Sequence, residues 1–218
     1  MTDFNSLRIS DPVHDTVGVS EVEVAVIDTR TFQRLRNIKQ LGLANLVFPG
    51  ADYSRLSHCI GVCHITGRIL GALAANTPNL DLGPQKIQAY RLAGLLHDIG
   101  HYPFSHAMED AIQNYRGDAL LEPDAQPINT INHEMVGKRI LEYDPEITEV
   151  LRTFDIEPNS ISAIFNRSQP DTLTNLISSD LDADRIDYLL RTAYFSGLPY
   201  GGVDLGPKPN KSVAGRIG

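Results

Sequence analysis

The chain has little cysteine. Its 218 residues include only two, Cys59 and Cys63, which lie four apart on an expected helix. With His58 and His64 they suggest a zinc cluster at first sight. Neighbouring residues of a helix point in different directions, however, so these four side chains cannot converge on one ion. The sequence therefore predicts two small, buried, reduced thiols.

Long apolar runs and excess positive charge are also missing. No apolar stretch approaches the ~20 residues that span a bilayer, and residues 1–10 lack the basic start and apolar core of a signal peptide. The formal net charge of −8 argues against a general nucleic-acid surface and leaves room for a local basic pocket that binds a phosphorylated small molecule. We therefore expect a soluble cytoplasmic protein without membrane association or stable duplex binding.

Helical patterns dominate what is present. Strand signals are weak, and residues 13–19 predict at most a short hairpin, so the fold class is all-α. The length suits one sizeable domain, which we place at residues 1–205 with a catalytic core at about 50–195 and an extended or disordered tail at 206–218. Residues 117–130 read as a loop.

Local signals give the helix boundaries. Ser20 and Glu23 form a capping box before a run through Ile27, and Asp28 or Thr29 caps the next helix. We expect that next helix to carry an apolar stripe. We also expect further helices at about 54–75 and 84–100, near 132, 145, 158 and 171, and at 181–192. The stripe consists of Phe32, Leu35, Ile38 and Leu41.

Residues 97–106 read His-Asp-Ile-Gly-His-Tyr-Pro-Phe-Ser-His, with three imidazoles and a carboxylate within ten positions. Such groups are costly to gather beside a core unless a cation or an anionic substrate compensates them. His97 and Asp98 close an apolar helix, where two adjacent side chains can face one ion. The best candidates to complete the ligand shell of that ion are His58 and either Asp182 or Asp184. Two imidazoles with two carboxylates suit Mn²⁺, Fe²⁺, Ni²⁺ or Mg²⁺ rather than structural zinc, and leave positions open for substrate.

These motifs resemble the HD-domain phosphohydrolase superfamily, in the branch of the sterile-alpha-motif/HD deoxynucleoside triphosphate triphosphohydrolase and its bacterial relatives. The resemblance covers nearly all of residues 8–205. It rests on residues 11–14, 32–42, 48–51, 54–58, 97–106, 132–134 and 182–188. It implies an HD-domain helical bundle that uses a divalent metal ion on a nucleotide substrate.

Carried over by position, the resemblance implies three sets of site residues. The metal ligands are His58, His97, Asp98 and Asp184, and the catalytic residues are His101, His106, Glu109 and His133. We assign the acid to His106, oriented by Glu109, with His133 assisting or bonding a phosphate; the two histidines could exchange roles. The nucleotide contacts are Gln40, Leu41, Arg55, Arg185 and Tyr188.

Each of three nucleotide contacts also has a purely structural explanation: an exposed charge for Arg55, a core position for Leu41 and a packing role for Tyr188. Asp28, Gln33 and Arg36 match a regulatory guanine-nucleotide site of relatives that assemble as tetramers, which implies a homo-oligomer; their alternative is a solvated face.

The sequence departs from the family pattern near the site. Tyr53, Leu56 and Ser57 replace the usual His, Phe and Glu, and Thr192 replaces an Asp. We predict hydrolysis of deoxynucleoside triphosphates to deoxynucleoside and tripolyphosphate. The alternatives are hydrolysis of nucleoside monophosphates, cyclic nucleotides or short oligonucleotides, and non-catalytic nucleotide sensing.

Overall fold

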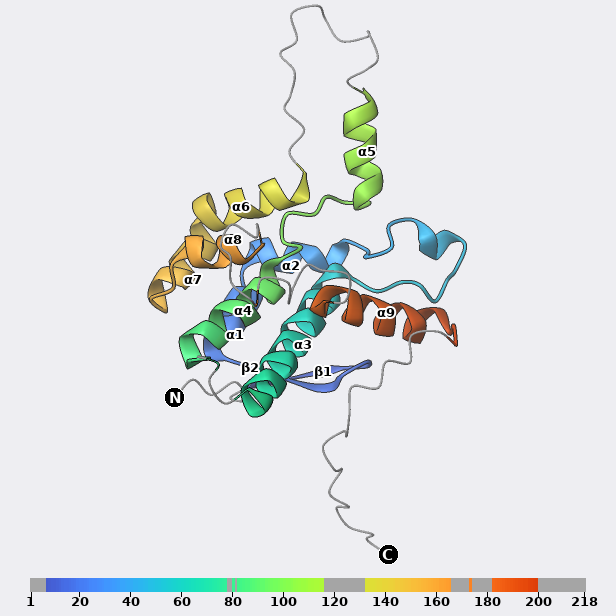
Figure 1. Cartoon of the computed structure of the whole chain (residues 1–218). Coiled ribbons are helices and arrows are strands. Elements are labelled where there is room, and N and C mark those ends of the chain that lie inside the picture. Colours follow the sequence, from blue (N-terminus) through green and yellow to red (C-terminus); the bar gives the residue numbers. More distant parts are fainter. Residues whose placement is uncertain are drawn as a thin grey trace, which may run out of the picture.

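The structure, a computed structural model, describes residues 7–77, 80, 82–115, 132–165, 173 and 182–199. This part of the chain is helical apart from one two-stranded hairpin (Figure 1), which confirms the predicted fold class. The expected loop at 117–130, the helix start near Asp171 and the tail at 206–218 lie outside the described residues. The domain limit at 205 stays a prediction.

The hairpin begins earlier than predicted. Strands β1 (Leu7–Asp11) and β2 (Asp15–Val19) run antiparallel, with Leu7 opposite Val19 and Asp11 opposite Asp15. The first strand gives little sequence signal because it buries only Asp11 fully and exposes most of its other side chains. The tight turn requires a positive φ of 61° at Asp15, which aspartate tolerates better than most residues.

Helix α1 (Glu21–Ile27) has the predicted capping box, and α2 (Arg30–Gln33) is capped by Thr29. The expected continuous helix through Leu41 is wrong, since the chain passes into a 3₁₀ turn, η1 (Arg34–Asn37), and becomes extended at Ile38. A second 3₁₀ turn, η2, covers Ala44–Leu46. Phe32, Leu35 and Ile38 are buried all the same, because a spacing of three residues also suits the three-residue period of a 3₁₀ helix.

Three helices form the frame of the site. The central helix, α3 (Arg55–Asn76), packs against α4 (Pro84–Leu96) and against α9 (Ala183–Ser196) (Figure 1). Pro84 opens α4 as predicted. The helix ends at Leu96 instead of Gly100, and residues 97–100 form a turn.

By length and composition α3 could cross a membrane, contrary to the expectation from sequence. It has 22 residues, with a mean hydropathy of 1.3 in its most apolar window. Half of that window is buried inside the protein, and core helices pass the same test, so these properties are weak evidence for a span. Both cysteines lie on this helix as buried free thiols, which confirms their predicted state.

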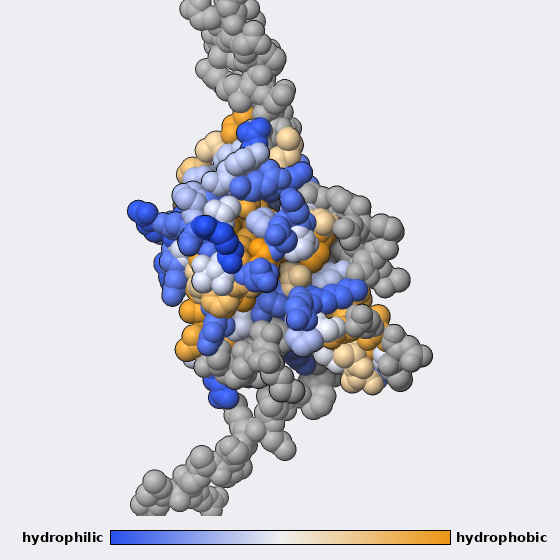
Figure 2. Space-filling model, turned by 90° about the vertical axis from the view of Figure 1, so that its left-hand side faces the viewer, coloured by the Kyte–Doolittle hydropathy of each residue, from blue (hydrophilic) through white to orange (hydrophobic). Residues whose placement is uncertain are grey.

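The remaining described helices are α5 (His106–Tyr115), α6 (His133–Tyr143), α7 (Pro145–Thr153) and α8 (Pro158–Phe165). Asn132 caps α6 and Asp144 caps α7, close to the predicted starts. Helix α8 packs against α4 and α6, while α7 packs against α1. Seen from the side of α6, α7 and α8, the surface is largely hydrophilic, with apolar atoms showing in smaller patches between polar ones (Figure 2).

Candidate metal centre and active site

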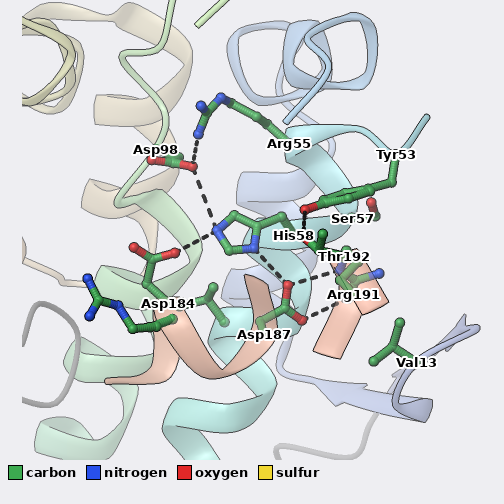
Figure 3. Close-up of polar contacts among 12 residues, drawn as sticks. Val13, Tyr53, Arg55, Ser57, His58, Asp98, Asp184, Asp187, Arg191 and Thr192 are labelled. Atoms are coloured by element: carbon green, nitrogen blue, oxygen red, sulfur yellow. Dashed lines mark hydrogen bonds and ion pairs between the residues drawn. The ribbon is translucent and has the colours of Figure 1, made fainter. Parts of the chain in front are cut away.

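The four predicted metal ligands come together at the ends of three helices, and Figure 3 shows three of them, His58, Asp98 and Asp184. His58 lies in the first turn of α3, His97 and Asp98 follow α4, and Asp184 lies in the first turn of α9. His58 Nε2 is 2.9 Å from Asp184 Oδ1 and 3.8 Å from Asp98 Oδ2. His97 Nε2 is 3.5 Å from Asp98 Oδ2 and 3.8 Å from Asp184 Oδ1. Each of the two imidazole nitrogens therefore lies within 4 Å of both carboxylates.

This arrangement fits a divalent cation. His58 Nε2 and His97 Nε2 are both buried, and neither makes a hydrogen bond with the described residues. One ligand atom from each of His58, His97 and Asp184 can be chosen so that all lie within 4.8 Å of one another. Buried polar atoms without partners are costly, and a cation would satisfy both nitrogens at once.

The alternative aspartate has another role. The Asp182 side chain accepts a hydrogen bond from the backbone N–H of Arg185 at 2.7 Å, which makes it the N-cap of α9. Asp184, two residues on, faces His58. The structure therefore favours Asp184 over Asp182 as the ligand.

The charges of the site also favour a cation. Burial opposes protonation of His58, but its close contact with the Asp184 carboxylate and its hydrogen bond to Asp187 outweigh burial and raise the pKa of His58 to about 9. Burial would raise the pKa of Asp98, yet His97, Arg55 and His101 hold it well below its usual value. Two ionised carboxylates therefore face two imidazoles, and a cation can take the place of the proton that His58 otherwise attracts.

Arg55, predicted to contact the nucleotide, lies beside the metal ligands. Its side chain is 3% exposed and forms an ion pair with Asp98 through Nη1. Its Nε and Nη2 donate to Ser105 Oγ at 3.2 and 2.9 Å. The alternative of an exposed helix-start charge is wrong, and Arg55 orients a ligand carboxylate in this structure.

The predicted catalytic residues form a second cluster at the start of α5 and α6. Glu109 accepts hydrogen bonds from His106 Nδ1 at 3.0 Å and from both the backbone N–H and Nδ1 of His133 at 2.8 Å. Although partial burial opposes it, these bonds lower the pKa of Glu109 to about 2. His101 stacks on His133 and reaches Asp98 Oδ1 with Nε2 at 3.3 Å. Asp98 and His101 thus join the two clusters.

Two contributors were missed from the sequence. Arg34 donates from Nη1 to the carbonyl of His101 at 2.8 Å and from Nη2 to the carbonyl of Ile99, so it fixes the turn that follows Asp98. No sequence pattern separates it from Arg36. Asp187 binds His58 Nδ1 at 2.7 Å, and its spacing of three residues from Asp184 on α9 could have revealed it.

The other predicted contacts differ in burial. Gln40 is half-buried, and its Oε1 is a buried atom without a hydrogen bond to the described residues. Leu41 is half-buried, and Arg185 and Tyr188 are exposed on α9. Their contact with a nucleotide stays a prediction.

The regulatory candidates lie around α2. Asp28 is exposed and ends α1, while Gln33 Oε1 accepts from Arg36 Nε at 3.1 Å and Gln33 Nε2 donates to the carbonyl of Ile27 at 2.8 Å. These bonds suit a solvated face, and the regulatory role stays a prediction.

Two departures from the family pattern contact each other. Tyr53 Oη lies 2.8 Å from Thr192 Oγ1, and burial raises the pKa of Tyr53 far above its usual value. Ser57 Oγ donates to the carbonyl of Ser54 at 2.8 Å, so this side chain is directed to the backbone of its own helix. The orientation of His58 therefore depends on Asp187 instead.

Comparison with known proteins agrees with this geometry. The HD domain family matches residues 55–192. The chain belongs to the HD-domain family. It is 36% identical over 198 residues to the uncharacterised protein YwfO of Bacillus subtilis, with 89% of this chain and 41% of YwfO covered. It is 32% identical over 203 residues to the Deoxynucleoside triphosphate triphosphohydrolase SAMHD1 homolog of Dictyostelium discoideum, with 90% of this chain and 38% of that protein covered.

A solved structure shares the fold. The chain of a hypothetical protein from Aquifex aeolicus superposes on this HD-domain protein with a TM-score of 0.69 at 36% identity. The similarity covers 89% of this chain and 47% of the other. The chain thus spans about two fifths of the length of the curated relatives named above and about half of the solved one.

Proposed function

We propose that this HD-domain protein is a metal-dependent phosphohydrolase that converts deoxynucleoside triphosphates into deoxynucleosides and tripolyphosphate. One observation carries the proposal: Asp98 lies between the His58–His97–Asp184 cluster and the imidazole of His101. Groups that can hold a cation are thereby joined to groups that can move a proton. Cleavage of a phosphoester needs both, because the phosphoryl charge must be neutralised and the leaving oxygen protonated.

Residues of the chain divide the chemistry between them. His58, His97, Asp98 and Asp184 would hold Mn²⁺, Fe²⁺, Ni²⁺ or Mg²⁺, and a bound ion supplies charge neutralisation at the phosphoryl oxygens. Glu109 is ionised at neutral pH and accepts the Nδ1 hydrogen of both His106 and His133, which leaves each Nε2 to exchange a proton. We assign the proton donor for the 5′ oxygen to His106, whose side chain is 67% exposed, and a phosphate contact to His133.

The choice of deoxynucleoside triphosphates rests on relatives. Proteins named Deoxynucleoside triphosphate triphosphohydrolase SAMHD1 from mouse and zebrafish are 35% and 38% identical over 152 and 138 residues. Both matches cover less than a quarter of those proteins, so the reaction is carried to this chain as a proposal.

The two reduced thiols support a cytoplasmic location.

A second candidate has one observation in its favour. Arg55 is the one buried cation among the proposed nucleotide contacts. Its guanidinium already forms an ion pair with Asp98 and donates a hydrogen bond to Ser105. A triphosphate carries more charge than a monophosphate or a diester and needs more cationic partners. A nucleotidase or phosphodiesterase that acts on monophosphates, cyclic nucleotides or short oligonucleotides would leave the Arg55–Asp98 pair intact.

Product analysis separates the candidates. The purified chain is incubated with Mn²⁺ or Mg²⁺ and with deoxynucleoside triphosphates, ribonucleoside triphosphates, monophosphates and cyclic nucleotides, and the products are resolved by anion exchange. We expect tripolyphosphate from the deoxynucleoside triphosphates. Orthophosphate from monophosphates would support the second candidate instead. Metal binding without turnover of any substrate would leave only a sensing role.

A further inference from the structure

We infer that the N-terminal hairpin is part of the metal centre, because it fixes Asp187 as a positioning residue for His58. The inference rests on the proposed metal site and goes beyond it. The HD family match begins at residue 55, whereas the hairpin ends at Val19. The hairpin contacts the HD-domain residues through the fully buried carboxylate of Asp187.

Asp187 is saturated with hydrogen bonds. Its Oδ2 accepts from His58 Nδ1 at 2.7 Å and from Arg191 Nε at 2.9 Å (Figure 3). Its Oδ1 accepts from His14 Nε2 at 2.6 Å and from Arg191 Nη2 at 2.9 Å. A carboxylate offers about four acceptor positions, and all four are used here. With 0% exposure, this side chain has no freedom to turn.

The bond to Asp187 also sets which nitrogen of His58 can bind a cation. An ionised carboxylate only accepts, so His58 Nδ1 must carry a hydrogen, and in the neutral ring that binds a cation Nε2 holds the lone pair. His58 Nε2 is the atom that faces Asp98 and Asp184. A histidine ligand that donates its other nitrogen to a carboxylate is a recurring arrangement in metal sites, where it fixes ring orientation and raises ligand basicity.

The hairpin supplies His14, whose Nε2 donates one of the four hydrogen bonds to Asp187. Asp11 Oδ1 accepts from the backbone N–H groups of Val13 and His14, both at 2.9 Å, and so shapes the turn that carries His14. Asp11 Oδ2 accepts from Arg191 Nη1 at 2.8 Å. The His14 side chain is only 3% exposed. The turn of the hairpin is therefore tied to α9 by two independent bonds.

The packing of α3 against α9 shows that this site admits no extra atoms. A Cβ on Gly61, one turn after His58, would lie 1.8 Å from Asp187 Oδ1 and 2.5 Å from Arg191 Nη2. Asp187 is short and locked by four bonds, so it could not yield without releasing His58. Gly61 thus permits the close approach that places Asp187 behind the ligand.

The test measures metal affinity directly. Mn²⁺ is titrated calorimetrically into the full chain and into Asp187→Asn, His14→Leu, His14→Gln and the matched control His64→Leu. His64 suits this purpose because its ring lies 5.3 Å from that of His14 and it makes no bond to Asp187. Co²⁺ is then bound to each protein, because its visible absorption reports the ligand geometry. Thermal unfolding in chelator measures folding separately.

We expect Asp187→Asn to weaken Mn²⁺ binding by about 10- to 100-fold and to shift the Co²⁺ spectrum. His14→Leu should weaken it in the same direction, and His14→Gln, which keeps a donor, should restore much of the affinity. His64→Leu should bind as the wild type does. Wild-type affinity and an unchanged Co²⁺ spectrum in His14→Leu would overturn the inference while the metal site itself stands. Failure of the wild-type chain to bind Mn²⁺ or Co²⁺ would overturn both.

Discussion

His101 and His133 stack on each other, with ring centroids 3.9 Å apart and planes 15° from parallel. Two protonated imidazoles in such contact would repel, so one must stay neutral. Burial lowers the pKa of His101 to about 4, despite its approach to Asp98. His101 is therefore the neutral partner at physiological pH.

Glu109 anchors both of those histidines, so its removal should affect turnover more than binding. We expect Glu109→Gln to lower kcat by about 10²- to 10⁴-fold, the usual contribution of positioned acid–base groups. Steady-state kinetics on the preferred nucleotide would measure this. Mn²⁺ affinity serves as the control and should be unchanged, since Glu109 is not among the predicted metal ligands. Loss of metal binding in this variant would contradict the separation into two clusters.

Asp98 should be essential for the cation and also important for folding. Asp98→Ala should abolish metal binding and activity while leaving helical content nearly unchanged. It also leaves the buried guanidinium of Arg55 without its carboxylate, and the free energy of unfolding should fall by about 3–5 kcal/mol. Asp98→Asn keeps a hydrogen-bond acceptor for Arg55 and should recover part of the stability without the activity. Circular dichroism, chemical unfolding and metal analysis distinguish these effects, and turnover retained by Asp98→Ala would disprove the metal assignment.

The predicted metal ligands lie in local sequence motifs, although the choice of Asp184 over Asp182 rested on the family resemblance. His97 and Asp98 are adjacent, His58 opens an apolar helix and Asp184 begins another. Their convergence follows once helices with these ends pack together. The spacing of Asp187 from Asp184 could have placed it near His58, but its bond to His14, 173 positions away along the chain, leaves no mark in the sequence.

The helix expected through Leu41 shows a different limit. A repeat of three apolar positions fits both an α-helix and a 3₁₀ helix, and the sequence alone does not separate them. The pairing of Lys39 with Ser54 decides the outcome by drawing the chain into an extended path. Such a contact depends on tertiary structure and leaves no mark in the local pattern.

Two glycines offer a matched test of the packing around the site. A Cβ on Gly100 would lie 2.0 Å from the carbonyl oxygen of His133 and 2.4 Å from the backbone nitrogen of Gly137. Gly100→Ala should therefore displace the start of α6, lower the free energy of unfolding by about 1–3 kcal/mol and reduce kcat through His133. Gly71→Ala meets nothing within 4 Å and should instead stabilise α3 by about 0.5–1 kcal/mol. Urea unfolding compares the two, and equal effects would argue against the close contact at Gly100.

His64 should make the protein sensitive to acid. Burial, with smaller contributions from His14 and two arginines, lowers the pKa of His64 to about 4. The unfolded chain takes up a proton at His64 near pH 6.5, whereas the folded protein does so only near pH 4. Stability at this position is therefore complete above pH 6.5 and is lost as the pH falls toward 4. His64→Gln removes the group, so the loss of unfolding free energy between pH 7 and pH 4.5 should shrink by about 1–2 kcal/mol. Urea midpoints measured in chelator test this, and because His101 still titrates in the variant, part of the acid sensitivity should remain. An unchanged slope would show that His64 accepts a proton as readily in the folded protein as in the unfolded chain.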